Sequence, residues 1–171
     1  VPTDTVYDKN NRVFQQVQDG KEINYLYHAT GELAEIQYGD GDGQRVVLYT
    51  YDDAGRPTAV KTRLDTFDAQ GERMEGAVKT VKTYAYANNR LATETEYLEF
   101  DEKPDGQGKT LTGTYTWNNA WYASGLTYSD GTAQEQMSQT RDARGYLTQV
   151  SYQGTHSSLQ RSVSESYGYD A

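Results

Sequence analysis

The chain lacks several residue types that globular proteins and enzymes commonly use. Its 171 residues include no cysteine, three prolines, two methionines and two histidines. The absence of cysteine excludes disulfides and thiolate chemistry. No apolar run approaches the roughly 18 residues that a membrane-spanning helix needs. Leu, Ile, Val and Phe are sparse, so a thick aliphatic core is not expected.

Tyrosine is abundant in this chain, in contrast to the sparse Leu, Ile, Val and Phe. Low mean hydropathy and a net charge of −9 would ordinarily favour disorder. The 16 tyrosines change this interpretation, because tyrosine forms strands and buries a large ring while its hydroxyl stays hydrated. We therefore expect a thin sheet whose core consists of rows of rings.

A degenerate repeat runs along the chain. In each copy an aromatic residue or arginine is followed four positions later by glycine or asparagine, and then by an apolar residue: Tyr7 to Asn11, Tyr27 to Gly31, Tyr51 to Gly55, Phe67 to Gly71, and Arg141 to Gly145. Tyr86 to Asn89 is a copy one residue shorter, and Trp117 to Gly125 is interpreted as a copy with an expanded loop. We call the first residue of each copy its anchor.

The pattern of each copy predicts a β-hairpin. Alternating residues before the anchor, such as Val47, Tyr49 and Tyr51, have the two-residue period of a strand. The residues after the anchor suit a type I turn, and the glycine or asparagine supplies the positive φ that closes it. Alternation breaks once in the return strand, which predicts a bulge. We expect an all-β, curved antiparallel sheet of tandem hairpins without substantial helix. It forms a single domain, 1–171, of about six to seven units with 167–171 incomplete.

Residues 49–60, YTYDDAGRPTAV, resemble the YD repeat of the RHS family. Segments 25–36, 84–94 and 141–150 are looser copies, and 167–171 looks like the opening of another unit. The resemblance implies a scaffold, since YD repeats build long curved sheets and, in Tc toxins and teneurins, hollow shells. This chain is too short for such a shell and has no counterpart of the self-cleaving Asp-Pro-x-Gly segment, so toxin and self-processing activity are not expected.

Two polar segments interrupt the repeat, at 39–44 and 101–108. We interpret them as long hairpin loops between strands that end near Tyr38 and Phe100 and resume near Arg45 and Lys109. A second interpretation of the first loop is calcium binding through Asp40 and Asp42, spaced like the first two ligands of an EF-hand. The remaining EF-hand positions do not match, so only a looser calcium site completed by a neighbouring loop stays open. No other cofactor is expected.

The two tryptophans lie close together, in a segment that also holds two amides. Trp117, Asn118, Asn119, Trp121 and Tyr122 are therefore candidate ligand-binding residues, because exposed rings stack on sugars while amides pair with hydroxyls. The alternative is that both tryptophan rings pack against the sheet or seal its end.

Catalytic signatures are missing. His28 takes the position of Asp52 in the clearest copy and is interpreted as a turn substitution, and His156 is expected in a solvated loop. There is no nucleophile elbow, metal-binding histidine pair or phosphate-cradling loop. We expect no enzyme activity.

The charge narrows the class of partner. An acidic chain is repelled by nucleic acid and by anionic lipid. The start at Val1 and the Tyr, Thr, Ser, Gly and Gln bias favour a secreted, surface or periplasmic protein, and a lipid anchor upstream stays open. We expect a structural or interaction protein that self-assembles through open sheet edges. The alternatives are a carbohydrate- or protein-binding module and an acidic immunity protein that neutralises a basic toxin.

Overall fold

A computed structural model describes residues 4–97, 110–118, 122–130, 133–156 and 159–168. Within these ranges every regular element is a strand, which confirms the all-β prediction. The strands are β1 (Asp4–Tyr7), β2 (Val13–Gln18), β3 (Lys21–Tyr27), β4 (Leu33–Asp40), β5 (Gly43–Tyr51), β6 (Pro57–Phe67), β7 (Arg73–Met74), β8 (Lys79–Ala87), β9 (Arg90–Tyr97), β10 (Thr110–Trp117), β11 (Ala123–Ser129), β12 (Gln134–Arg141), β13 (Leu147–His156) and β14 (Leu159–Ser166).

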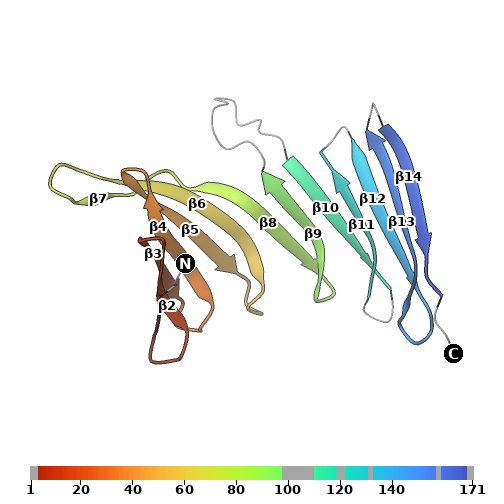
Figure 1. Cartoon of the computed structure of the whole chain (residues 1–171), viewed down its shortest axis with the longest axis horizontal. Coiled ribbons are helices and arrows are strands. Elements are labelled where there is room, and N and C mark those ends of the chain that lie inside the picture. The colour runs from red at the N-terminus through yellow and green to blue at the C-terminus, as the bar shows by residue number, and fades with distance from the viewer. Residues whose placement is uncertain (1–3, 98–109, 119–121, 131–132, 157–158, 169–171) are drawn as a thin grey trace. The chain divides into compact units, whose positions relative to one another are not determined.

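The strands form consecutive antiparallel hairpins in one open sheet (Figure 1). Spatial order follows chain order from β1 to β14, except that β7 pairs only with β6 and β8 then continues the sheet. The chain divides into two compact units, residues 1–83 (unit 1) and 84–171 (unit 2). The single-domain organisation stays a prediction.

Five of the anchors stand where the strand register shifts. Bulges separate Val6 from Tyr7, Leu26 from Tyr27, Thr50 from Tyr51, Thr116 from Trp117 and Thr140 from Arg141. The residue four positions after the anchor has positive φ in the copies predicted to need it, at Asn11, Gly31, Gly55, Gly71 and Gly145. The predicted turn chemistry and the predicted break in alternation are therefore both confirmed.

The β2–β3 and β4–β5 hairpins, which do not follow an anchor, close through two-residue turns. Asp19 and Gly20 both have positive φ between β2 and β3, as expected for type I′ geometry. Asp40 pairs with Gly43 across Gly41 and Asp42, so the predicted long loop at 39–44 is wrong. The strands extend through it because each of its Gly and Asp residues either pairs in the ladder or sits in the tight turn.

Two further loop predictions differ in outcome. The loop at 101–108 lies outside the described residues. His156, expected in a solvated loop, instead ends β13 and pairs with Leu159 of β14, because the β13–β14 hairpin runs further than its composition indicates.

A buried carboxylate organises the detour between β6 and β8. Asp65 is 0% exposed, and its oxygens accept hydrogen bonds from Arg63 Nε at 3.0 Å, Arg73 Nε at 2.8 Å and the Gly76 backbone N–H at 3.0 Å. Residues 66–67 pair with β7, while residues 59–62 pair with β8. Asp65 thus fixes the point where the chain leaves β6 for the β7 hairpin and returns.

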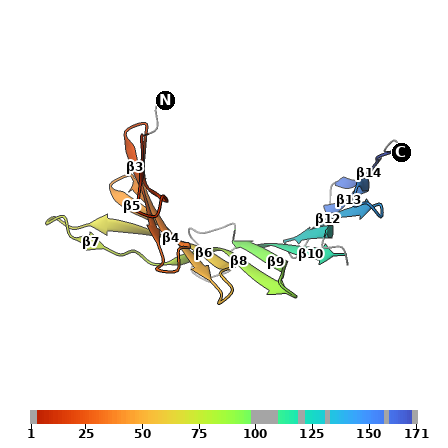
Figure 2. The same ribbon diagram turned by 90° about the horizontal axis from the view of Figure 1, so that it is seen from below.

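The apolar core is thin. Among the described residues the buried apolar side chains are Val46, Ala59 and Val150. The buried polar side chains are Asp65 and Glu94. In Figure 2 the strands of unit 2 form a single layer. Stability must therefore come mainly from strand pairing and from cross-strand side-chain contacts, as the tyrosine content predicts.

Candidate functional site

The turns that follow the anchors are built alike. In the clearest copy the Asp52 N–H donates to the Arg56 carbonyl and the Gly55 N–H donates to the Asp52 carbonyl, both at 2.9 Å. Asp52 Oδ1 accepts from the N–H groups of Ala54 and Arg56, at 3.0 Å each. The side-chain hydrogen bond from Arg56, and then its backbone N–H, hold the pKa of Asp52 below its usual value. Asp8, Asp68 and Asp142 accept the equivalent backbone bonds.

His28 takes the place of the aspartate in its copy. Its N–H donates to the Glu32 carbonyl at 2.9 Å, and the Gly31 N–H donates to the His28 carbonyl at 3.0 Å. The backbone turn is therefore unchanged, which confirms the interpretation of His28 as a turn substitution. The His28 ring lies edge-on to Tyr51, with the ring centroids 6.0 Å apart.

Two anchors of unit 1 bond their hairpin to the hairpin before it. Tyr27 Oη donates to the Val13 carbonyl at 2.8 Å, and Tyr51 Oη donates to the Leu33 carbonyl at 2.9 Å. Val13 and Leu33 each open the return strand of the preceding unit. This contact suits a tyrosine anchor, since the ring must reach across to the neighbouring strand and its hydroxyl must donate to a carbonyl there.

Trp117 makes the same contact in unit 2. Its Nε1 donates to the carbonyl of Leu91 at 2.8 Å. The Asn118 N–H donates to the Tyr122 carbonyl at 3.0 Å, and Trp117 pairs with Ala123. This matches the pairing of Tyr51 with Pro57. The prediction of an expanded loop ending at Gly125 is therefore wrong: the loop has the ordinary length, and Gly125 lies in β11.

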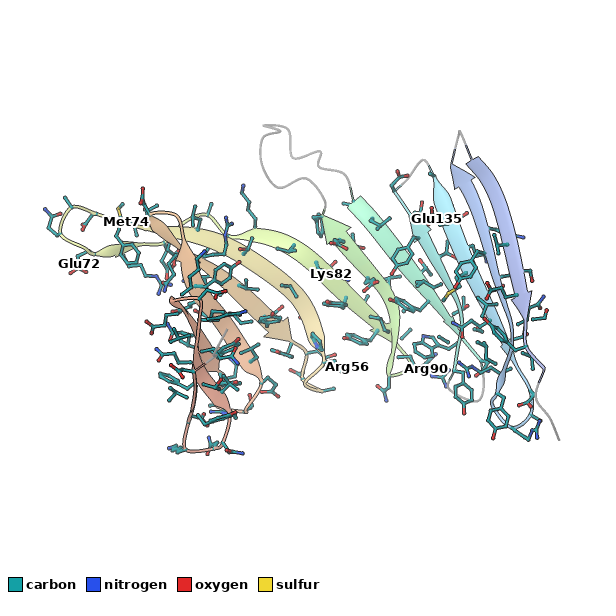
Figure 3. All side chains as sticks on the ribbon, in the orientation of Figure 1. Arg56, Glu72, Met74, Lys82, Arg90 and Glu135 are labelled. Carbon is teal, nitrogen blue, oxygen red and sulfur yellow. The ribbon has the colours of Figure 1, made fainter. Side chains whose placement is uncertain are left out.

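Arginine and aromatic side chains meet where these turns cluster at one end of unit 2, which we call the turn end. The Arg90 guanidinium lies 5.9 Å from the Trp117 ring, and Arg90 donates to the Asn118 carbonyl at 3.0 Å. Arg141 lies 4.8 Å from the Tyr122 ring. Arg90 is labelled beside these turns in Figure 3. Each of these pairs joins two consecutive hairpins, so cation–π attraction supplements the anchor hydrogen bond.

The predicted ligand-binding residues fall into two groups. Trp117 is 36% exposed and Tyr122 is 41% exposed, while Asn118 uses its side-chain oxygen to accept the Tyr122 N–H at 3.0 Å. Asn119 and Trp121 lie outside the described residues. Trp117 and Asn118 thus have structural tasks, Tyr122 presents a ring to solvent, and binding of a ligand here stays a prediction.

The predicted calcium ligands flank the tight β4–β5 turn. Asp42 is exposed in that turn, and the Asp40 side chain lies outside the description. No group of three or more His, Cys, Asp or Glu side chains suited to a metal occurs within the described ranges. The calcium site stays a prediction.

A polar cluster in unit 2 could not be found from sequence patterns. Glu94 Oε1 accepts from Tyr115 Oη at 2.9 Å and from Tyr128 Oη at 3.1 Å. Burial, followed by the hydrogen bond and charge of Glu94, raises the pKa of Tyr115. Gly113 lies between them in the ladder, and a Cβ there would stand 2.9 Å from the Tyr128 ring. Only strand register brings these residues together.

Unit 1 carries an open depression of about 570 Å³ at its own turns. It is lined by His28, Thr30, Glu32, Tyr49, Thr50, Tyr51, Asp52, Asp53 and Gly55. His28, Asp52 and Gly55 belong to the turns described above and Tyr51 is an anchor, so the depression is interpreted as the outer surface of two neighbouring hairpins.

Comparison with known proteins gives limited results. No family model matches the chain, and no curated protein matches significantly. Among solved structures, the chain is similar to the crystal structure of TcdB2-TccC3-Cdc42, with 12% identity and a TM-score of 0.26 over 96% of this chain and 13% of that one. TcdB2-TccC3 without its hypervariable C-terminal region gives 12% identity and a TM-score of 0.25 over 86% of this chain and 12% of that one. Within the described ranges, no helix is long and apolar enough to cross a membrane.

Proposed function

We propose that this chain is a non-catalytic structural and interaction module of YD-like hairpin repeats. The observation that carries the proposal is the repeated anchor bond, from Tyr27 to Val13, from Tyr51 to Leu33 and from Trp117 to Leu91. The same contact recurs between successive hairpins. A contact that repeats along the chain indicates a structural role, because each hairpin needs its neighbour to bury its aromatic rings.

The YD-like assignment rests on the residues of the repeat. The clearest copy, residues 49–60, folds as the end of β5, a five-residue turn and the start of β6. Its tyrosine, aspartate and glycine each have a defined task, as anchor, as acceptor in the turn and as the positive-φ residue. These tasks of the tyrosine, aspartate and glycine support an RHS-like structural role for the chain.

The two buried carboxylates of the described residues have structural partners. Asp65 is held by two arginines and a backbone N–H. Glu94 accepts two tyrosine hydroxyls. Both carboxylates therefore already accept internal hydrogen bonds, which favours a non-catalytic function.

The module is proposed to act by pairing through its edge strands. β1 and β14 stand at the two ends of the strand order, and an edge strand offers backbone donors and acceptors to another chain. Val6 and Val163 are 48% and 39% exposed on these strands. An exported location, secreted or at the cell surface, belongs to the same proposal.

The test is the molar mass in solution, measured by light scattering across a wide concentration range. The native chain is expected to form ordered multimers, and Val163→Lys is expected to shift them toward monomer, because an edge lysine opposes strand pairing. Thr66→Lys, exposed in the β6–β7 hairpin, is the matched control and should assemble normally. A native chain that is monomeric throughout would contradict edge assembly.

A second candidate function is ligand binding at the turn end of unit 2. The exposed Tyr122 and Tyr146 rings, each beside an arginine, favour it. Tyr122→Ala should then abolish binding to a responsive glycan or protein while edge assembly persists. Retained binding in that variant would remove this candidate.

A further inference from the structure

The two faces of strands β9–β14 differ completely in chemistry. Side chains alternate between the faces of a strand, and the strand registers assign each paired residue to one face. One face, which we call the hydroxyl face, carries Thr93, Thr95, Thr110, Thr112, Thr114, Thr116, Thr127, Ser129, Gln134, Gln136, Ser138, Thr140, Gln149, Ser151, Gln153, Ser164 and Ser166, together with Tyr97 and Gly125.

Charge is confined to the other face. Glu94, Glu96, Glu135 and Glu165 pair with Gly113, Leu111, Tyr128 and Val150, on the face that also holds Tyr115, Leu126, Met137 and Tyr152. Charged residues make up 24% of the chain, yet none of the described side chains assigned to the hydroxyl face is charged. The surfaces of soluble proteins usually carry interspersed charges of both signs, so a face without any needs an explanation.

The hydroxyl face is also partly pre-oriented. Thr95 and Thr112 are 3.3 Å apart at their hydroxyls, and so are Ser151 and Ser164. Gln149 Nε2 donates to Ser164 Oγ at 3.1 Å. Cross-strand bonds of this kind limit rotation of the side chains. Each hydroxyl can still accept or donate a further bond, since it has one donor and two acceptor sites.

We propose that the hydroxyl face binds a neutral polysaccharide. The chemistry of the face matches an uncharged polymer of hydroxyl and amide groups, because it offers donors and acceptors in rows and no charge. The rows repeat at about 4.8 Å between strands and about 6.8 Å along them. Many weak contacts on one surface therefore add up along a polymer.

Other occupants fit the face less well. A polyanion gains nothing from a face without cations, and an apolar partner would desolvate hydroxyls without satisfying them. A second copy of the chain brings its own net charge of −9, and like charges at short range oppose face-to-face stacking. A neutral polyhydroxylated partner avoids all three costs.

The experiment measures depletion of the full chain from solution by insoluble cellulose, chitin and a β-1,3-glucan, with serum albumin as a control for adsorption. The native chain is expected to bind at least one polymer. Thr114→Val combined with Ser138→Ala removes two exposed hydroxyls, keeps strand-compatible side chains and should weaken binding at least fivefold. Thr66→Val, an exposed threonine of unit 1, should bind like the native chain.

A second variant keeps the test decisive if loss of two hydroxyls is tolerated. Gln136→Lys places a charge at an exposed position within the hydroxyl face, where polymer binding would have to desolvate it, and should also reduce binding. Unchanged binding in both variants would overturn the proposal, as would failure of the native chain to bind any of the polymers.

Two further outcomes would also overturn it. Loss of binding in Tyr122→Ala alone would move the site to the turn end, and loss of multimers in the Thr114→Val, Ser138→Ala variant would make the face a self-pairing surface. The proposal is independent of edge assembly. Light scattering on the same variants separates failure of one from failure of the other.

Discussion

The first residue of each anchor turn carries the side-chain hydrogen bonds of that turn. Asp52 accepts two backbone N–H groups and the Arg56 guanidinium. Asn118 accepts such an N–H in the tryptophan copy, and the His28 turn keeps the same two backbone bonds without an aspartate. The preference of the repeat for Asp or Asn at this position is therefore a preference for a short side chain with an acceptor.

Asp52→Ala should destabilise the chain more than Asp52→Asn. Alanine removes all the acceptors, whereas asparagine keeps the carbonyl oxygen that the backbone N–H groups of Ala54 and Arg56 need. Thermal unfolding followed by circular dichroism should show a midpoint lower by roughly 2–4 °C for the alanine variant. Equal midpoints for both variants would contradict this assignment of the turn.

Asp65 is the residue on which unit 1 should depend most. Asp65→Ala leaves Arg63 and Arg73 without their shared buried partner, so the free energy of unfolding should fall by about 3–5 kcal/mol. Denaturant unfolding measures this loss. A loss within the error of native would show that the detour after β6 is held by other contacts.

The same carboxylate predicts a pH dependence. Burial raises the pKa of Asp65, but the Gly76 N–H and the two arginines outweigh it and hold the pKa below the usual 3.8. A depressed pKa adds stability that is complete above the unfolded-state value, about 3.9, and is lost as pH falls through the folded value. The native chain should therefore lose stability below about pH 4 more steeply than Asp65→Ala, and parallel curves would contradict this.

At the scale of the hairpin, sequence reasoning succeeds where chemistry is local. Glycine or asparagine at the fourth position after the anchor predicts a positive φ, and Gly31, Gly55 and Gly145 have it. Sterics make this conformation costly for residues other than glycine, asparagine and aspartate, so it can be predicted without knowing the partner strand. Strand boundaries next to these turns follow for the same reason.

The β8–β9 turn offers the cleanest test of this local rule. Asn88 and Asn89 have φ of 50° and 60°. Asn89→Gly should leave stability unchanged or slightly higher, while Asn89→Val should cost about 1–2 kcal/mol, since a β-branched residue resists positive φ. Asn10 is a turn residue without positive φ, so Asn10→Val is the control. A tolerated Asn89→Val would contradict the assigned turn.

Features that depend on register or burial could not be predicted. In the tryptophan copy position 121 holds Trp where other copies have glycine or asparagine, so counting forward to Gly125 overestimates the loop. The Asp65 and Glu94 clusters assemble residues from different strands, and no spacing in the chain marks them. The hydroxyl face is likewise visible only after strand registers decide which residues share a side.

For the whole molecule, charge acts against the proposed edge assembly. Copies that each carry a net charge of −9 repel one another, and salt screens that repulsion over about 10 Å at 0.1 M. The average multimer size should therefore increase between about 10 mM and 150 mM salt. Sedimentation velocity measures this. A decrease with salt would indicate that ion pairs, and not strand edges, hold the assembly together.

The fold class could be predicted for the entire described chain, whereas partners could not. Tyrosine content, turn residues and alternation all indicate a thin antiparallel sheet, and each is a local property. What the sheet binds depends on which faces and edges stay uncovered, and composition reports only that the chain is acidic. The tryptophan segment shows the difference, since Trp117 is an anchor as well as a candidate contact.

The most direct test of the central claim, that anchors join successive hairpins, is the free energy of unfolding of two anchor variants. Tyr27→Phe and Tyr51→Phe each remove one hydroxyl and leave the Val13 or Leu33 carbonyl without its donor. Each should lose about 0.5–1.5 kcal/mol, while Tyr152→Phe, at a ring that is 48% exposed, should match the native chain. Anchor variants as stable as Tyr152→Phe would contradict the account.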